Sequence, residues 1–234
     1  RSDLPANEAS VWKPSMSEPQ ELEIEIISDV VCPWCYIGLA HLRQAIAWLE
    51  GQQPGLSTRL RVRWSPYMLN PRMPETGMPR RDYLVAKFGQ AGLAGYAQIA
   101  DHARAAGLPM NLDAIPVQPN TLAAHVLIAA MGDEATTLVD QLFQAFFVDG
   151  RNLADQAVLL DCAEAAGLSA ECAQAALADT MLVKRVSHIA EEWVDHGVNG
   201  VPTFRLKSGS AERLINGAAA PSVLGQTLLQ MMQP

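Results

Sequence analysis

Two cysteines, three positions apart, are the residues of this chain whose type and spacing could do chemistry. Cys32 and Cys35 enclose Pro33 and Trp34. Residues three apart in the first turn of a helix point to one side, and a disulfide needs Cβ atoms about 3.5–4.5 Å apart. The spacing therefore predicts a pair that can form and break a disulfide with little strain.

The residues around the pair predict a different role for each cysteine. Apolar residues at helical spacing follow the motif, and Pro33 suits a first helical turn, where its missing N–H is no loss. Cys32 then lies at the helix N-terminus, where unpaired N–H groups and the helix dipole stabilise a thiolate. Such sites lower a cysteine pKa from about 8.5 to about 3.5–7.5. We therefore predict that Cys32 attacks the substrate disulfide. Cys35, one turn further on the buried side, is predicted to resolve the mixed disulfide that forms.

A C-x-x-C motif alone is also compatible with half of a zinc site. Zinc would need two more ligands at matching spacing, and the other cysteines, Cys162 and Cys172, form no second C-x-x-C. A motif between a strand and a helix favours redox chemistry, so we expect no metal. Cys162 and Cys172 fall in predicted helices and are interpreted as small buried hydrophobic residues. A second disulfide or a redox relay is the alternative.

The motif is flanked by two segments that alternate as strands do. In residues 22–28, leucine and isoleucine alternate with glutamate, and in residues 58–64, apolar residues alternate with arginine. A helix joins the two segments, and such a βαβ unit is typical of parallel pairing. Pro66 is expected to end the second strand.

The middle of the chain is interpreted as a run of helices. It begins with a proline-punctuated loop over residues 67–80. Helical patterns separated by glycine turns then cover about residues 81–88, 93–106, 122–131, 134–148, 154–166 and 170–178. The chain closes with a helix, two strands and a final helix, predicted over residues 180–196, 201–206, 213–215 and 223–232.

Composition limits the classes of partner. The chain is 49% hydrophobic and has a net charge of −8. No basic cluster occurs, so we expect no nucleic-acid or anionic-membrane partner, and no apolar run reaches the roughly 18 residues of a membrane helix. No signal-peptide core is visible, so a cytoplasmic location is expected. Residues 1–19 are polar and are interpreted as a disordered extension or a cloning remnant. The oligomeric state is left open.

The order of elements resembles the thioredoxin fold of the DsbA family of thiol–disulfide oxidoreductases, and in particular its FrnE-like branch. The resemblance is carried by residues 28–38 (SDVVCPWCYIG), 69–74 (LNPRMP), 147–152 (FVDGRN) and 200–204 (GVPTF). It implies an α/β thioredoxin fold with a large all-helical insertion. The thioredoxin-like domain would comprise residues 20–66 and 180–234, and the insertion residues 67–179.

The resemblance also implies how substrate is bound. The Val201–Pro202 bond would be cis and would face the cysteines, leaving the backbone of Val201 free to pair with an extended peptide. Val201 and Pro202 would then bind substrate together with Pro33 and Trp34. Strongly oxidising DsbA proteins carry a histidine between the cysteines, which this chain lacks. The reduction potential could therefore lie anywhere between about −270 and −120 mV.

The function indicated is thiol–disulfide exchange with a disulfide- or thiol-containing protein or a small thiol. Glutathione is a candidate co-substrate, and no other cofactor is expected. One alternative is a glutathione-dependent isomerase or transferase of the 2-hydroxychromene-2-carboxylate isomerase or kappa-class type, which share the fold and use serine where Cys32 stands. Another is a peptide-binding module or chaperone, with its groove lined by the loop over residues 67–78.

The histidines show no metal-ligand spacing and no visible acid–base partner. They are therefore interpreted as surface or helix-face residues: His41, His102, His125, His188 and His196.

Overall fold

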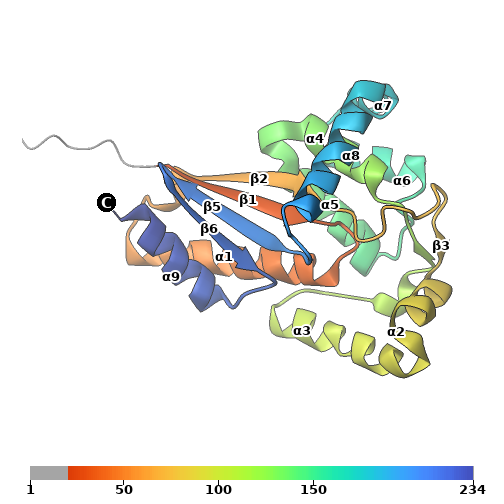
Figure 1. Cartoon of the computed structure of the whole chain (residues 1–234), viewed down its shortest axis with the longest axis horizontal. Coiled ribbons are helices and arrows are strands. Elements are labelled where there is room, and N and C mark those ends of the chain that lie inside the picture. Colours follow the sequence, from red (N-terminus) through yellow and green to blue (C-terminus); the bar gives the residue numbers. More distant parts are fainter. Residues whose placement is uncertain (1–20, 234) are drawn as a thin grey trace, which may run out of the picture.

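A mixed four-stranded sheet forms the centre of the fold in the computed structural model, which describes residues 21–233. The prediction for residues 1–19 lies outside this part. The strand order is β2-β1-β5-β6, with β1 parallel to β2 and the other pairs antiparallel (Figure 1). Its strands are β1 (Leu22–Ser28), β2 (Leu60–Pro66), β5 (Thr203–Ser208) and β6 (Ala211–Asn216). Within the described part, residues 80–179 add no strand to this sheet, so the predicted βαβ unit and fold class are confirmed.

Three strands differ in their bounds from the prediction. β2 begins two residues late because Ser57–Arg59 form a 3₁₀ turn, and it continues through Pro66, which an edge strand tolerates. β5 begins at Thr203, after the Val201–Pro202 bond. β6 is longer than expected because Gly209, with φ +57°, closes a tight turn.

One face of the sheet is buried under two helices. Leu22, Ile24 and Ile26 alternate with glutamates along β1 and are almost fully buried. They pack in one core cluster with residues of α1 (Pro33–Gln52) and α9 (Pro221–Met232), which lie side by side against this face (Figure 1). The period of two along the strand therefore places the apolar side chains where predicted.

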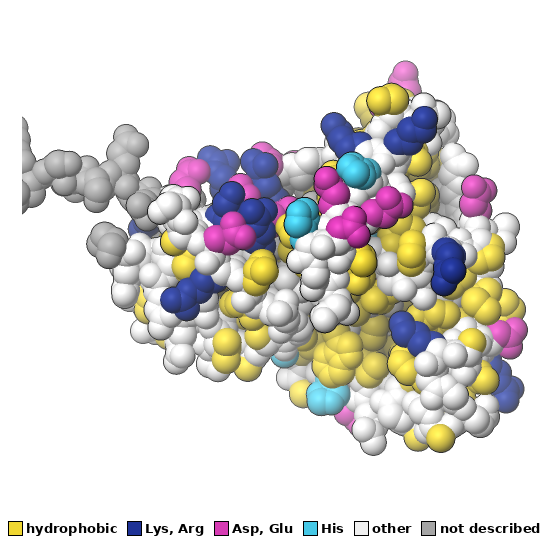
Figure 2. All heavy atoms as spheres, viewed as in Figure 1, with side chains coloured by type: hydrophobic (Ala, Val, Ile, Leu, Met, Phe, Trp, Pro, Cys, Tyr) yellow, Lys and Arg dark blue, Asp and Glu magenta, His cyan; other side chains and the backbone are white. Residues whose placement is uncertain are grey.

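The opposite face of the sheet carries a ladder of ion pairs, called here the charged face. Acidic and basic side chains are interspersed over the strands in Figure 2. The pairs are Arg61–Glu21 at 2.7 Å, Arg63–Glu23 at 3.6 Å, Arg205–Glu25 at 3.0 Å and Arg205–Glu212 at 3.1 Å. The pairs of Arg61 and Arg63 are exposed, and exposed pairs contribute about 0–1 kcal/mol each to stability.

The inserted segment is mostly helical, as predicted. Its helices, followed by the helix that returns to the sheet, are α2 (Arg80–Ala97), α3 (Ile99–Ala105), α4 (Leu122–Met131), α5 (Ala135–Phe143), α6 (Gln156–Ala165), α7 (Ala170–Ala178) and α8 (Thr180–Asp195). Gly89, with φ +68°, breaks α2 near the gap left between the two predicted helices. The predicted helix over residues 134–148 ends instead in a π-helical turn, Gln144–Val148.

The insertion is not all-helical, although the family resemblance implied that it would be. β3 (Met78–Pro79) and β4 (Val117–Gln118) form a separate antiparallel pair. Gly77, with φ +76°, lets the chain approach the Gln118 carbonyl closely, because a Cβ there would lie 2.5 Å from that oxygen. Strands of two residues are too short to leave an alternating pattern in the sequence.

A single aromatic core joins the inserted helices to the cysteine-bearing helix. The Tyr36 ring of α1 stacks on Phe147 with centroids 5.6 Å apart and lies 5.1 Å from Phe143. Cys32 and Cys35 belong to the same buried cluster. The core therefore crosses the predicted domain boundaries near residues 67 and 179, which remain predictions.

One helical stretch, Leu122–Val148, is long and apolar enough to cross a membrane by length and composition alone. Gly132 interrupts it with φ +56°, so α4 and α5 are separate helices. Of its most apolar window, 44% is buried inside the protein. Core helices pass the same test, so we infer no membrane span from this stretch.

Candidate active site

The two cysteines open α1. Cys32 is the N-cap residue, Pro33 occupies the first helical position, and the Cys35 N–H donates to the Cys32 carbonyl at 3.0 Å. Both thiols are free and are only 4% and 2% exposed. The strand-to-helix junction therefore places the pair as the sequence predicted, except that Cys32 is nearly as buried as Cys35.

The pKa values of the two thiols are shifted in opposite directions. The Cys35 side chain hydrogen-bonds Cys32 and holds the pKa of Cys32 below that of a free thiol, against the effects of burial and the nearby Asp29 carboxylate. Burial, followed by the hydrogen bond and charge of Cys32, raises the pKa of Cys35 well above its usual value. The shifts favour ionisation at Cys32 over ionisation at Cys35, the order of acidity needed for an attacking and a resolving cysteine.

A proline loop faces the dithiol. The Val201–Pro202 bond is cis, and the Cys32 thiol donates to the Val201 carbonyl at 3.5 Å. Val201 and Pro202 are buried, whereas Trp34 is 38% exposed at the rim, with its ring 5.1 Å from that of His102. The predicted site residues are therefore brought together by α1 and the start of β5.

A cavity of about 520 Å³ opens beside Cys32. It is lined on one side by the dithiol motif and the proline loop, and on the other by α2 and α3, including Arg80, Tyr83 and Tyr96. Of the loop over residues 67–78, only Leu69 is among the lining residues described. The groove is therefore built by the broken helix α2, which the sequence analysis did not connect with the site.

Two buried polar residues near the dithiol, Asp29 and His125, were not predicted as part of the site. Asp29 accepts the Leu69 N–H at 2.8 Å and lies 3.5 Å from His125, whose Nε2 is also 3.1 Å from the Tyr67 carbonyl oxygen. His125 therefore lies on a buried face of α4, with only 3% of its side chain exposed, and the interpretation that it has no acid–base partner is wrong. A histidine inside an apolar helical run was the available signal, because a buried polar group needs a partner.

His188, Cys162 and Cys172 do not line the cavity beside Cys32. His188 pairs with Glu192 at 3.3 Å on exposed α8, so it too has an acidic partner. Cys162 is buried as predicted, and burial raises its pKa. Cys172 is exposed, which contradicts its interpretation as a buried residue. Neither is bridged.

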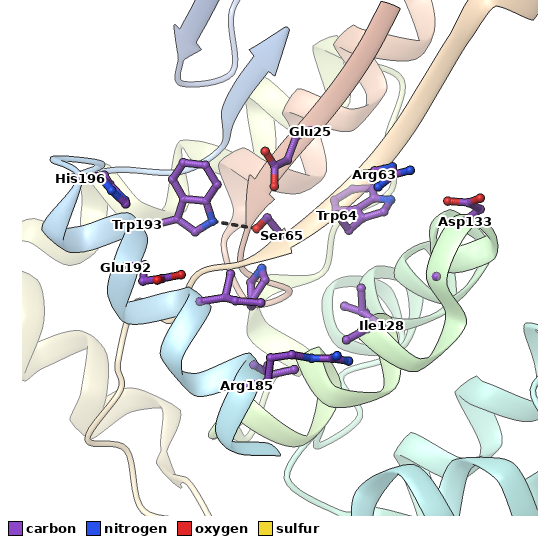
Figure 3. A pocket seen from close by; sticks show the side chains of 15 residues that line it. Glu25, Arg63, Trp64, Ser65, Ile128, Asp133, Arg185, Glu192, Trp193 and His196 are labelled. Atoms are coloured by element: carbon purple, nitrogen blue, oxygen red, sulfur yellow. Dashed lines mark hydrogen bonds between the residues drawn. The ribbon is translucent and has the colours of Figure 1, made fainter. Parts of the chain in front are cut away.

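A second cavity, of about 650 Å³, lies between β2, α4 and α8 (Figure 3). Trp193 donates to the Ser65 hydroxyl at 2.7 Å, while Arg185 and Glu192 project from α8 around the opening. Neither Cys32 nor Cys35 lines it. This cavity is therefore not where the dithiol can react.

Two substitutions should move the Cys32 pKa in opposite directions. Cys35→Ala removes the hydrogen bond that contributes most to the lowering, so the pKa should rise. Asp29→Asn removes a repelling negative charge but keeps an acceptor for Leu69, so the pKa should fall. Only the thiolate is nucleophilic, so alkylation near about pH 6 should slow in the first variant and quicken in the second. Rates of iodoacetamide modification against pH measure this, and shifts of equal sign would contradict it.

Fold and site together define a thioredoxin-fold protein with inserted helices and a dithiol opposite a cis-proline. A family model described as a DSBA-like thioredoxin domain matches residues 23–229, and the chain belongs to this family. The family and fold predictions are thereby confirmed.

Three known proteins are similar to this chain. The uncharacterised protein YwbO of Bacillus subtilis strain 168 is 27% identical over 218 residues, covering 88% of this chain and 96% of the relative. A probable DsbA oxidoreductase from Streptomyces coelicolor superposes with a TM-score of 0.76 at 28% identity, covering 90% of each chain. The cytosolic disulfide reductase DsbM from Pseudomonas aeruginosa shares the fold, with a TM-score of 0.61, 19% identity and coverage of 90% and 95%.

Proposed function

We propose that this protein is a FrnE-like thiol–disulfide oxidoreductase that works through Cys32 and Cys35. The observation that carries the proposal is the free Cys32–Cys35 dithiol opposite a cis-proline, with Cys32 lining a groove. The opposite shifts of the two thiol pKa values agree with it. Backbone groups of Val201, with Pro202, Pro33 and Trp34, would hold the substrate disulfide against Cys32. Family membership supports disulfide chemistry in general.

The exchange proceeds in two displacements. The Cys32 thiolate attacks one sulfur of a substrate disulfide, forming a mixed disulfide and expelling the other sulfur as a thiolate that takes up a proton. Cys35 then loses its proton and attacks Cys32 Sγ, forming the Cys32–Cys35 disulfide and releasing the second substrate thiol. The substrate is reduced and the dithiol oxidised by one electron pair, and the reverse sequence oxidises a substrate dithiol.

The alternative is a glutathione-dependent isomerase or transferase on the same fold. Such an enzyme needs one hydrogen-bond donor at the position of Cys32, and a second thiol with a raised pKa has no role in it. The buried Cys35, hydrogen-bonded to Cys32, therefore favours exchange. Glutathione as the recycling co-substrate and a cytoplasmic location remain predictions under either function.

The test is equilibration of the reduced protein in buffers of defined glutathione ratio. We expect a protein lighter by two hydrogen atoms as the buffer becomes more oxidising, with the loss confined to the peptides that contain Cys32 and Cys35. The midpoint gives the reduction potential, in which about 30 mV corresponds to a tenfold change in equilibrium. A Cys32 that forms only a stable glutathione adduct, with no internal disulfide at any ratio, would contradict the proposal.

A further inference from the structure

Arg80 is a buried cation without an anionic partner. Its side chain is 6% exposed, and its Nε has no hydrogen-bond partner in the described structure. The guanidinium carbon lies 5.6, 5.3 and 5.5 Å from the ring centroids of Tyr83, Tyr96 and Phe146, and Nη2 donates to the Tyr96 hydroxyl. Among residues 21–233, no carboxylate lies within ion-pair distance of it. Because burying an unpaired charge is costly, an anion that reached this arginine would be stabilised there.

Arg80 lines the same cavity as Cys32. The second cation of that cavity is Lys87, whose Nζ donates to the Tyr83 hydroxyl at 2.8 Å. No aspartate or glutamate is among the described residues that line the cavity. Tyr83 and Tyr96 line this cavity together with Cys32, so the aromatic cage around Arg80 and the reactive sulfur face a common space. The cavity thus combines a nucleophilic sulfur with unneutralised positive charge.

We propose that Arg80 is a carboxylate-binding residue and that the substrate of this site is a small disulfide or thiol that carries a carboxylate. The inference rests on the proposed exchange at Cys32. The cavity of about 520 Å³ falls in the range of small-molecule pockets, about 300–1,000 Å³. A guanidinium fork binds a carboxylate with two parallel hydrogen bonds, and the free Nε is one arm of such a fork. Since the whole chain carries a charge of −8, attraction of an anion must come from this local charge.

The chemistry at sulfur is the exchange already described. Arg80 pairs with the carboxylate while the Cys32 thiolate displaces one sulfur of the disulfide. One anionic thiol leaves with a proton, and the second leaves when Cys35 closes the Cys32–Cys35 disulfide. Arg80 itself takes no part in bond making, so its contribution is confined to binding and orientation.

The test is the single-turnover rate of the reduced protein with three short disulfides that differ in charge. The probes are dithiodipropionate, hydroxyethyl disulfide and cystamine, which are anionic, neutral and cationic, and each rate is divided by the rate with free dithiothreitol. We expect the normalised rates to fall in that order, with oxidised glutathione grouped with the anionic probe. A wild-type protein that shows no preference for the anion would overturn the inference.

Arg80→Met should lower the rate with dithiodipropionate by about tenfold or more, since hydrogen bonds to charged groups are worth about 1.5–3 kcal/mol. The rate with hydroxyethyl disulfide should change little, and Arg80→Lys should fall between. Arg81→Met is the matched control, because it removes the same charge from the next, exposed position. Equal loss with all three probes would assign Arg80 a packing role only and overturn the inference. Failure of the wild type to reduce even the neutral probe would instead refute the proposed exchange.

Discussion

Replacing Cys35 with serine is expected to leave the protein covalently joined to its substrate through Cys32. The thiolate at Cys32 can still attack, but the thiol that would displace the substrate from Cys32 Sγ is gone. Turnover should fall by roughly 10³-fold or more, the scale on which loss of a covalent catalytic group acts. Non-reducing electrophoresis and mass spectrometry of Cys35→Ser protein mixed with oxidised substrate measure the adduct.

Two controls locate the adduct. Cys172→Ser in the Cys35→Ser background removes the exposed cysteine and should leave the adduct unchanged. Adding Cys32→Ser should abolish it. The isomerase alternative expects the reverse behaviour, since Cys35→Ser would keep its activity and Cys32→Ser would be tolerated, because a hydroxyl can donate to a bound thiolate. Absence of any trapped species, together with disulfide reduction no faster than by free dithiol, would end the exchange hypothesis.

Gly38→Ala is expected to destabilise the protein, whereas Gly51→Ala in the same helix should not. A Cβ on Gly38 would lie 2.7 Å from Pro202 Cγ and 3.4 Å from Phe204, so α1 must move away from the proline loop. Overpacking of this kind costs about 1–3 kcal/mol. A Cβ on Gly51 meets nothing within 4 Å and should raise the helix propensity by up to about 1 kcal/mol.

Urea denaturation of the two variants gives both free energies of unfolding. The same displacement should slow the reaction of Cys32 with a disulfide in Gly38→Ala only, because Cys32 opposes Val201 across this contact. Equal stabilities for the two variants would show that the helix and the proline loop adjust freely. In that case the close approach does not hold the site together.

The dithiol and the helix that carries it could be predicted because their signals are local. Alternating residues in β1, Pro33 at the first helical position and the adjoining apolar pattern all lie within one short stretch. The cis state of the Val201–Pro202 bond was implied by family resemblance and is present in the structure. Local patterns could not have supplied it, since cis bonds are a minority even before proline.

The walls of the groove could not be predicted, because they depend on contacts between distant segments. In the sequence, Arg80 is one of two arginines at the start of a predicted helix. In the folded protein it is buried among aromatic rings from α2 and from the π-helical turn. The pairing of Asp29 with His125 could not be predicted either, because the two residues meet only when the chain after β1 packs against α4. The exposure of Cys172 could not be predicted for the same reason. Helical periodicity does not indicate which face of a helix packs against another element.

The charged face has a consequence for how molecules of this protein meet one another. An uncovered sheet face with apolar residues would invite a second sheet to stack on it. Here, two copies approaching face to face would have to strip water from the exposed Arg61–Glu21 and Arg63–Glu23 pairs, and the cost of such desolvation can exceed the gain. Opposite charges alternate within a Debye length of about 8 Å at physiological salt, so the face presents little net field to attract a partner. Its colloidal effect is to disfavour self-association through the sheet.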